Sequence, residues 1–172
     1  MWYYQVKFLT FFAAIYCVLH GAYLLIPDEV LKEKIYYQGI VSISAELINL
    51  FSNEHVNAHH NILSSSKAAL EVVRGCDGAG TLFLIIAATI AFSCSIKHKL
   101  VGLLSGVALV YLLNQIRIVG LYFVVAYQRS WFEPIHTYFA PSLIVLICIL
   151  YFAWWSIYGQ AKESQPQADE SA

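Results

Sequence analysis

Charged side chains are scarce in this chain. Of its 172 residues, 12% are Asp, Glu, Lys or Arg, whereas 59% are apolar. A soluble domain is roughly half apolar and about a quarter charged, so the composition alone predicts an integral membrane protein. The net charge is −1, and no basic stripe of the kind that binds nucleic acid is present. We therefore expect no nucleic-acid partner.

Several sequence signatures of catalysis or metal binding are also missing. No C-x-x-C pair occurs, which argues against a thiol oxidoreductase or a zinc ribbon. No G-x-S-x-G motif begins a helix, which disfavours a rhomboid-like serine protease. His59 and His60 follow His55 in a polar stretch with only Glu54 as a further ligand, so we interpret it as a solvated loop. Neither a metal nor a cofactor is expected.

Four apolar runs are long enough to be membrane spans. About 20 apolar residues cross the hydrocarbon core of a bilayer, and the candidates are residues 4–26, 78–96, 100–122 and 138–158. The first run has no small-residue cleavage site after it, so we interpret it as a retained span rather than a signal peptide. The expected fold is an all-α, polytopic membrane helix bundle. Residues 1–159 form its single domain, and the polar tail 160–172 is expected to be disordered.

A long polar segment, residues 27–75, separates the first two spans. Its middle has loosely amphipathic spacing, with apolar residues at Ile40, Ile43, Leu47, Ile48 and Phe51. This spacing predicts an interfacial helix that lies on the membrane surface or packs on the bundle. A second helix is predicted for "KAALEVV", just before Arg74.

The shortest connection marks the orientation. Lys97, His98 and Lys99 join the second and third spans, and two lysines in so short a turn favour the cytoplasmic side. Both termini then lie inside, and residues 27–75 lie outside. Trp2, Tyr3 and Tyr4 then share a boundary with an aromatic group at the other end of the chain, which consists of Trp154, Trp155 and Tyr158. In the third span, Gly102 and Gly106 predict a close helix contact.

The stretch "RGCDGAG" places Cys76 in a polar, glycine-rich setting where the second span begins. The other cysteines, Cys17, Cys94 and Cys148, lie within or near the ends of apolar runs, where cysteine behaves as a small hydrophobe. A helix N-terminus and the nearby Arg74 both favour a thiolate, so we expect a lowered pKa for the Cys76 thiol. Asp77 opposes this effect but can cap the helix. A packed small residue beside a capping aspartate is the alternative.

Two other spans carry polar residues at the same expected depth as Cys76. Arg117 lies roughly 25 Å along the third span at about 1.5 Å per residue, and Asn114 lies on the same helix face. His136 lies at the start of the fourth span. Because ionisable residues within spans usually face the bundle interior, we expect Cys76, Arg117 and His136 to meet at the outer boundary.

The order of these residues resembles the exosortase/archaeosortase family. The matching pieces are "RGCDGAG" around Cys76, "NQIR" with Asn114 and Arg117, and "PIHT" with His136. The resemblance covers residues 71–151, and His136 favours the bacterial branch. It implies a multi-pass protein of the bacterial cytoplasmic (inner) membrane with its active site on the extracytoplasmic face. Many members of the family are longer, and Asp77 stands where a small or neutral residue is expected.

The resemblance implies a cysteine transpeptidase or protease, which is a hydrolase-type enzyme of protein sorting. Its partners would be exported proteins that end in a short motif, a transmembrane helix and a basic cluster. Cys76 would be the nucleophile, His136 the general base or acid, and Arg117 the oxyanion-stabilising group. Asn114, Arg74 and Asp77 would support the site or bind substrate. Membrane lipid, an amine or water would accept the acyl group.

Two other functions stay open at the level of sequence. One is a non-catalytic membrane subunit for the assembly or export of secreted polysaccharide or protein. The other is a small transporter in which Arg117 binds an anion, although the paired broken helices typical of transporters are missing. The sequence does not identify the sorting motif, the scissile bond, the acceptor, the oligomeric state or the role of the His55, His59 and His60 cluster.

Overall fold

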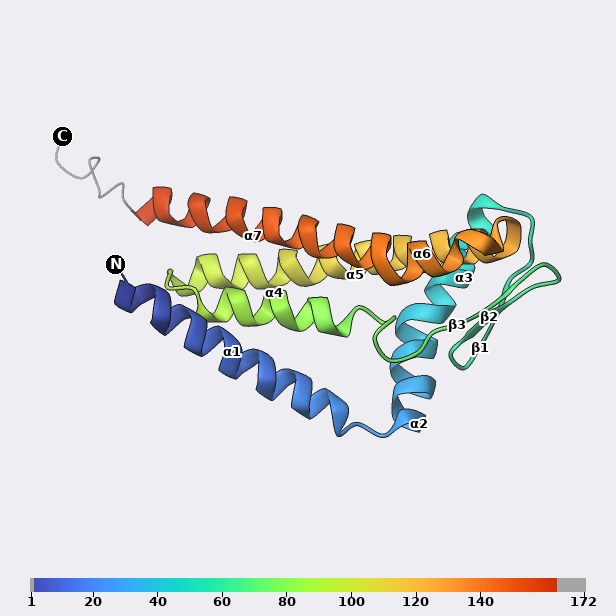
Figure 1. Ribbon diagram of the computed structural model, residues 1–172, viewed down its shortest axis with the longest axis horizontal. Coiled ribbons are helices and arrows are strands. Elements are labelled where there is room, and N and C mark those ends of the chain that lie inside the picture. Colours follow the sequence, from blue (N-terminus) through green and yellow to red (C-terminus); the bar gives the residue numbers. More distant parts are fainter. Residues whose placement is uncertain (1, 164–172) are drawn as a thin grey trace.

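Four apolar helices run side by side along the molecule and form its main body (Figure 1). The computed structural model describes residues 2–163, with side chains through Tyr158. The four helices are α1 (Trp2–Leu24), α4 (Ala79–Ala91), α5 (Ile96–Tyr127) and α7 (Ala140–Glu163). Helix α4 packs against the other three, and α5 also packs against α7. The predicted membrane helix bundle is confirmed.

The helices differ in length from the predicted spans. Three segments are long and apolar enough to cross a membrane, namely Trp2–Leu24, Ile96–Tyr127 and Arg129–Tyr158. Helix α4 has 13 residues instead of the predicted run 78–96, and at about 1.5 Å per residue it is about 20 Å long. It is therefore shorter than the hydrocarbon core of roughly 30 Å. Its N-terminal end, next to Cys76, is the place where the site is built.

The connection between α4 and α5 is not the one predicted. Residues 92–95 form the linker, whereas Lys97, His98 and Lys99 lie in the first turn of α5. Lys99 donates to the Ile90 carbonyl at 2.8 Å, near the end of α4. His98 stacks on Trp155 with ring centroids 4.6 Å apart. Trp155 is thus buried, while the exposed Trp154 and Tyr158 are free to form the predicted aromatic belt.

The close contact predicted from Gly102 and Gly106 joins α5 to its neighbours. A Cβ atom added at Gly102 would lie 2.3 Å from the Trp155 ring, and one at Gly106 would lie 3.1 Å from Ile85. These glycines let α7 and α4 approach the backbone of α5. The contact is internal to the bundle, as expected for small residues at helix interfaces.

Residues 27–75 form a cap on one end of the bundle. The helical part is continuous and crosses the bundle axis in Figure 1; it consists of α2 (Asp28–Val30), η1 (Leu31–Val41) and α3 (Ser42–Phe51). An antiparallel sheet follows, in the order β1 (Asn57–His59), β2 (Ile62–Ser64) and β3 (Ala69–Glu71). The predicted interfacial helix is therefore present. The predicted helix at "KAALEVV" is wrong, because that segment forms β3 and pairs with β2.

The sheet includes part of the stretch with His55, His59 and His60, which the sequence analysis interprets as a solvated loop. His59 ends β1, and His55 and His60 have positive φ angles of 50° on either side of it. His55 and His59 are four residues apart, a spacing that brings two side chains together on a helix, but residues 52–66 are not helical.

The largest core lies where the cap meets the bundle. It contains the fully buried rings of Tyr36 and Tyr122 together with Val41, Ile48 and Leu63. By contrast, Tyr23 is the only buried residue of α1 among those described. Side chains of α1 thus face outward over most of its length, as lipid-facing side chains do, and a second, smaller core lies within the bundle around Ile85, Val110, Ile144 and Cys148.

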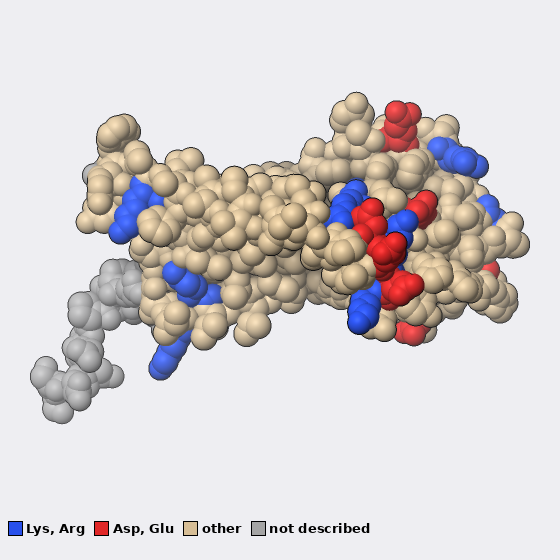
Figure 2. Space-filling view, turned by 90° about the horizontal axis from the view of Figure 1, so that it is seen from below, with Lys and Arg blue, Asp and Glu red and all other residues tan. Residues whose placement is uncertain are grey.

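Charges divide the surface into three zones. Figure 2 shows a middle band without charged side chains. On the visible face, the end of the bundle away from the cap carries only Lys or Arg, and the cap end carries both signs.

Helix α7 continues to Glu163, four residues into the tail predicted to be disordered; residues 164–172 lie outside the described part.

Candidate active site

A glycine-rich loop between β3 and α4 holds Cys76 at the junction of cap and bundle. Gly75 and Gly78 have positive φ angles of 88° and 79°, a region that favours glycine. The Cys76 N–H donates to the Val73 carbonyl at 2.9 Å, which folds the loop back on itself. Gly78 is the N-cap of α4. The glycines of "RGCDGAG" therefore set the position of the thiol.

His136 faces the thiol from the segment that leads into α7. Its Nε2 lies 3.4 Å from the Cys76 Sγ, within hydrogen-bond distance. The imidazole stacks on Phe132 with centroids 5.0 Å apart and planes at 7°. Its other nitrogen, Nδ1, is buried without a hydrogen-bond partner among the described residues. An aromatic face, rather than a carboxylate, thus orients this histidine.

Arg117 approaches Cys76 from α5. Its Nη1 donates to the Cys76 carbonyl at 3.4 Å, and its Nε is buried without a partner among the described residues. Asn114 donates from Nδ2 to the Asp77 carbonyl at 3.0 Å. Its side chain also occupies the space that a Cβ atom at Gly78 would need. Asn114 therefore holds the loop rather than contacting Arg117. The structure brings Cys76, Arg117 and His136 together, as the spacing of the spans predicted.

The electrostatics at Cys76 differ from the expectation. Burial raises the pKa of the Cys76 thiol above its ordinary value, while the charge of Arg117 acts in the opposite direction. The expectation of a lowered thiol pKa is therefore corrected: a neutral thiol beside an imidazole is the resting arrangement that these surroundings favour.

Arg74 fastens the loop instead of assisting the thiol. Its Nε donates to Asp28 at 2.9 Å, its Nη1 donates to the Tyr23 carbonyl at 2.8 Å, and its Nη2 donates to the Ile26 carbonyl. The Asp28 carboxylate raises the pKa of Arg74, so its charge is retained. Arg74 thus binds the turn that follows α1, which anchors the cap to the bundle.

Asp77 points toward two tyrosines. Its Oδ2 accepts hydrogen bonds from Tyr23 and, at 3.2 Å, from Tyr36, while Oδ1 accepts from the Ala79 N–H at 3.3 Å. The expected capping by Asp77 takes a different form, because Gly78 is the N-cap and makes no side-chain cap bond, and Asp77 accepts only from the first N–H of α4. The two tyrosines were not singled out by the sequence, because nothing near them in the chain marks them as partners of a residue more than 40 positions away.

A cavity of about 370 Å³ opens beside the thiol, which is within the usual size range of ligand sites. One wall is the chain from Ala69 to Val73, which includes β3, and Cys76 and His136 lie at its end. The remaining lining comes from α5 and the segment after it, namely Ile118, Leu121, Val125, Arg129 and Phe132. The walls are mainly apolar, so the cavity can exclude water from a bound chain.

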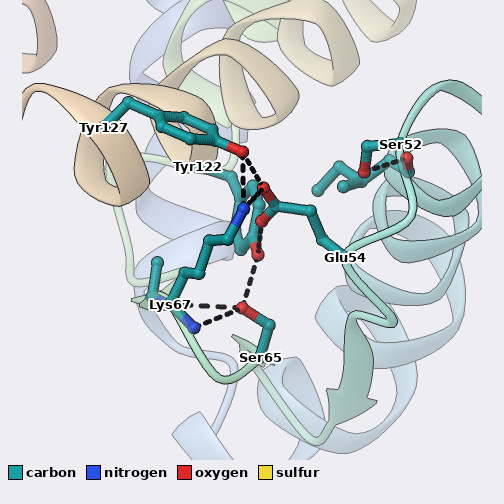
Figure 3. A network of polar contacts seen from close by, with 8 residues as sticks. Ser52, Glu54, Ser65, Lys67, Tyr122 and Tyr127 are labelled. Atoms are coloured by element: carbon teal, nitrogen blue, oxygen red, sulfur yellow. Dashed lines mark hydrogen bonds and ion pairs between the residues drawn. The ribbon is translucent and has the colours of Figure 1, made fainter.

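A polar network holds the sheet against α5 (Figure 3). Glu54 accepts hydrogen bonds from Tyr122 at 2.7 Å and from Tyr127, and Lys67 donates to both Glu54 and Tyr127 at 3.0 and 2.8 Å. Ser65 lies 2.6 Å from the Tyr122 hydroxyl. Glu54 precedes β1, and Lys67 lies in the turn between β2 and β3, so the network fixes β3 relative to the helix that carries Arg117.

Fold and site together define a class: a membrane helix bundle with a cysteine, a histidine and an arginine side by side at one end. Comparison with protein families agrees with this class, because the model of the transmembrane exosortase family (Exosortase_EpsH) matches residues 1–154. The chain belongs to the transmembrane exosortase family. No curated protein and no solved structure matches it.

Proposed function

We propose that this exosortase is a cysteine transpeptidase or protease that cleaves a C-terminal sorting signal of exported proteins through a thioacyl intermediate. The observation that carries the proposal is the 3.4 Å separation of the Cys76 Sγ and the His136 Nε2. A nucleophile and a base within hydrogen-bond reach, beside a cavity, are the minimal arrangement for acyl transfer. Packing alone does not require an imidazole to face a thiol.

The steps follow from these groups. His136 takes the proton from the Cys76 thiol as the sulfur attacks the scissile carbonyl carbon, which forms a carbon–sulfur bond and an oxyanion. Arg117, whose Nε is buried without a partner among the described residues, stabilises that oxyanion, a role worth roughly 2.7–4 kcal/mol for one donor. The carbon–nitrogen bond then breaks, and His136 gives its proton to the leaving amine. Water, an amine or a lipid head group releases the acyl chain from the thioester.

The raised thiol pKa fits this use of His136. A buried thiol that is mostly neutral needs a base at the moment of attack, whereas a preformed thiolate does not. Arg117 limits the shift because its charge favours the thiolate.

Orientation follows from the distribution of charge. Lys97 and Lys99 lie in the first turn of α5, at the end of the bundle away from the cap, and basic residues favour the cytoplasmic side of a membrane. We therefore infer that the cap and Cys76 lie on the extracytoplasmic face of the cytoplasmic membrane. There they would meet the segment that precedes the transmembrane helix of a substrate.

The test is processing in cells. The chain is co-expressed with candidate exported proteins that end in a motif, an apolar helix and a basic cluster, and the new end of each product is determined by mass spectrometry. Cys76→Ala should abolish processing. The matched control is Cys17→Ala on the exposed side of α1, which should leave processing intact. Continued processing by Cys76→Ala would refute the proposal.

A further inference from the structure

The outer edge of β3 carries main-chain groups without partners. The Ala68 carbonyl accepts from the Ser65 N–H at 2.9 Å, and the Val72 N–H donates to the Asn61 carbonyl at 2.8 Å. Both bonds point toward β2. Because main-chain groups alternate in an antiparallel strand, those of Ala69 and Glu71 point away from β2. Within the part of the chain that the structure describes, β3 is an end strand of the sheet.

This free edge is also a wall of the cavity that contains the thiol. The chain from Ala69 to Val73 lines the cavity, and Cys76 follows it directly. The hydrogen bond from the Cys76 N–H to the Val73 carbonyl turns the loop so that the thiol lies at the end of the edge. A chain lying along β3 would therefore lead to Cys76 and His136.

An exposed strand edge usually invites unwanted pairing and is kept short, charged or covered. This edge is held in place instead. Lys67, two residues before β3, joins Glu54 and Tyr127, and the fully buried Val72 anchors the far end of the strand. A rigid edge loses little conformational entropy when a further strand binds to it.

We propose that the outer edge of β3 binds the extended substrate segment next to the scissile bond as a fourth strand. The inference rests on the proposed function and names the substrate's conformation and class: an extended polypeptide with apolar side chains at alternate positions. Main-chain hydrogen bonds to Ala69 and Glu71 supply affinity that is independent of sequence. Alternate side chains of the bound strand face the apolar wall formed by Ile118, Leu121 and Val125.

The test uses two thiol-directed probes, so that binding along β3 is separated from reactivity of the thiol. Chloroacetamide has no peptide backbone, so its rate of reaction with Cys76 measures the reactivity of the thiol without any binding along β3. Acetyl-Val-Ala-Val-Ala chloromethyl ketone adds an extended backbone, and displacement of chloride by the sulfur forms a thioether in both cases. The measured quantity is the ratio of the second-order rate constants of the two probes, determined in detergent on the full chain.

Two variants at one position are compared. Glu71→Pro removes the outward N–H, which an edge strand tolerates, whereas Glu71→Thr keeps it; both lose the hydrogen bond from Asn61 to the Glu71 carboxylate. We expect the peptidyl-to-chloroacetamide ratio to be about tenfold lower in Glu71→Pro than in Glu71→Thr, as for the loss of one main-chain hydrogen bond with its partner left unpaired. Equal ratios in the two variants would overturn the proposal.

A second measurement does not depend on how Glu71→Pro folds. On the wild-type chain, peptidyl probes N-methylated at alternate residues should fall into two groups. Methylation in the register that faces β3 should slow labelling about tenfold, and methylation in the other register should change it about twofold or less. Equal slowing in both registers would overturn the strand-pairing proposal. If chloroacetamide itself fails to label Cys76 even at alkaline pH, where the thiolate forms, the proposed function fails, which is a different outcome.

Discussion

The imidazole of His136 lies flat on the ring of Phe132, with the planes at 7° and the centroids 5.0 Å apart. This contact replaces the acceptor that usually orients a catalytic histidine, because the His136 Nδ1 has no hydrogen-bond partner among the described residues. Removal of the ring in Phe132→Ala should leave the imidazole free to turn away from the thiol. We expect kcat for processing to fall by about tenfold to a hundredfold, the range associated with misplacement by about 1 Å.

Phe132→Tyr is the matched control, because it keeps an aromatic face of the same shape. Steady-state kinetics on a processed substrate separate orientation from binding. An effect on KM alone would mean that Phe132 contacts substrate in the cavity and does not position His136.

The thiol of Cys76 should titrate above its ordinary pKa of about 8.5. Burial raises the pKa, and a raised pKa keeps the thiol protonated at neutral pH. The rate of alkylation by iodoacetamide should therefore still be rising above pH 8.5. Arg117→Gln removes the charge that favours the thiolate, so it should move the profile to higher pH, whereas Arg117→Lys should move it less. A plateau already reached at neutral pH would contradict the raised pKa.

The helical part of the fold could be predicted because the bilayer imposes one simple rule. A run of about 20 apolar residues has few alternatives to a membrane helix, and α1, α5 and α7 fall where such runs occur. The depth of Arg117 and His136 then followed from counting residues along the spans. The boundaries differ from the prediction: Lys97 and Lys99 lie in the first turn of α5 and not in the connection, since a charged first turn at a membrane surface is compatible with a helix.

The sheet could not be predicted in the same way. Its strands have three residues each, too few for a period of two to be distinguished from the helical spacing of "KAALEVV". Partners far apart in sequence were also missed. Tyr23 and Tyr36 bind Asp77 across 54 and 41 positions, and burial raises the pKa of Cys76, which its local sequence did not reveal.

Gly78 should not tolerate a side chain. Its φ of 79° costs an L-residue roughly 1–2 kcal/mol, and a Cβ atom there would lie 2.9 Å from Asn114. We expect Gly78→Ala to displace Asn114 or the loop and to reduce processing at least about tenfold. Gly80→Ala is the control, since nothing lies within 4 Å of its Cβ position. Equal activity of the two variants, measured on matched amounts of folded protein, would argue against this role of Gly78.

Gly102→Ala should destabilise the bundle. The added Cβ would lie 2.3 Å from the Trp155 ring, and the ring is held by its stacking on His98, so α5 and α7 must separate. Overpacking of this kind costs about 1–3 kcal/mol and should lower the Tm measured in detergent. Gly120→Ala, in the same helix with nothing within 4 Å of its Cβ position, should keep or raise the Tm, because alanine favours helices by up to about 1 kcal/mol.

Glu54 should make the stability of the cap depend on pH in the acid range. Hydrogen bonds from Tyr127, Tyr122 and Lys67 lower the pKa of Glu54 to about 2, compared with about 4.3 in an unfolded chain. Its stabilising effect is therefore fully present above about pH 4.3 and is lost as the pH falls toward 2. Glu54→Gln keeps the shape but not the charge, so the Tm of the wild-type chain should exceed that of the variant at neutral pH. The difference should narrow between about pH 4.3 and 2, as followed by thermal unfolding in detergent. A difference that stays constant over this range would mean that the carboxylate charge does not hold the sheet to α5.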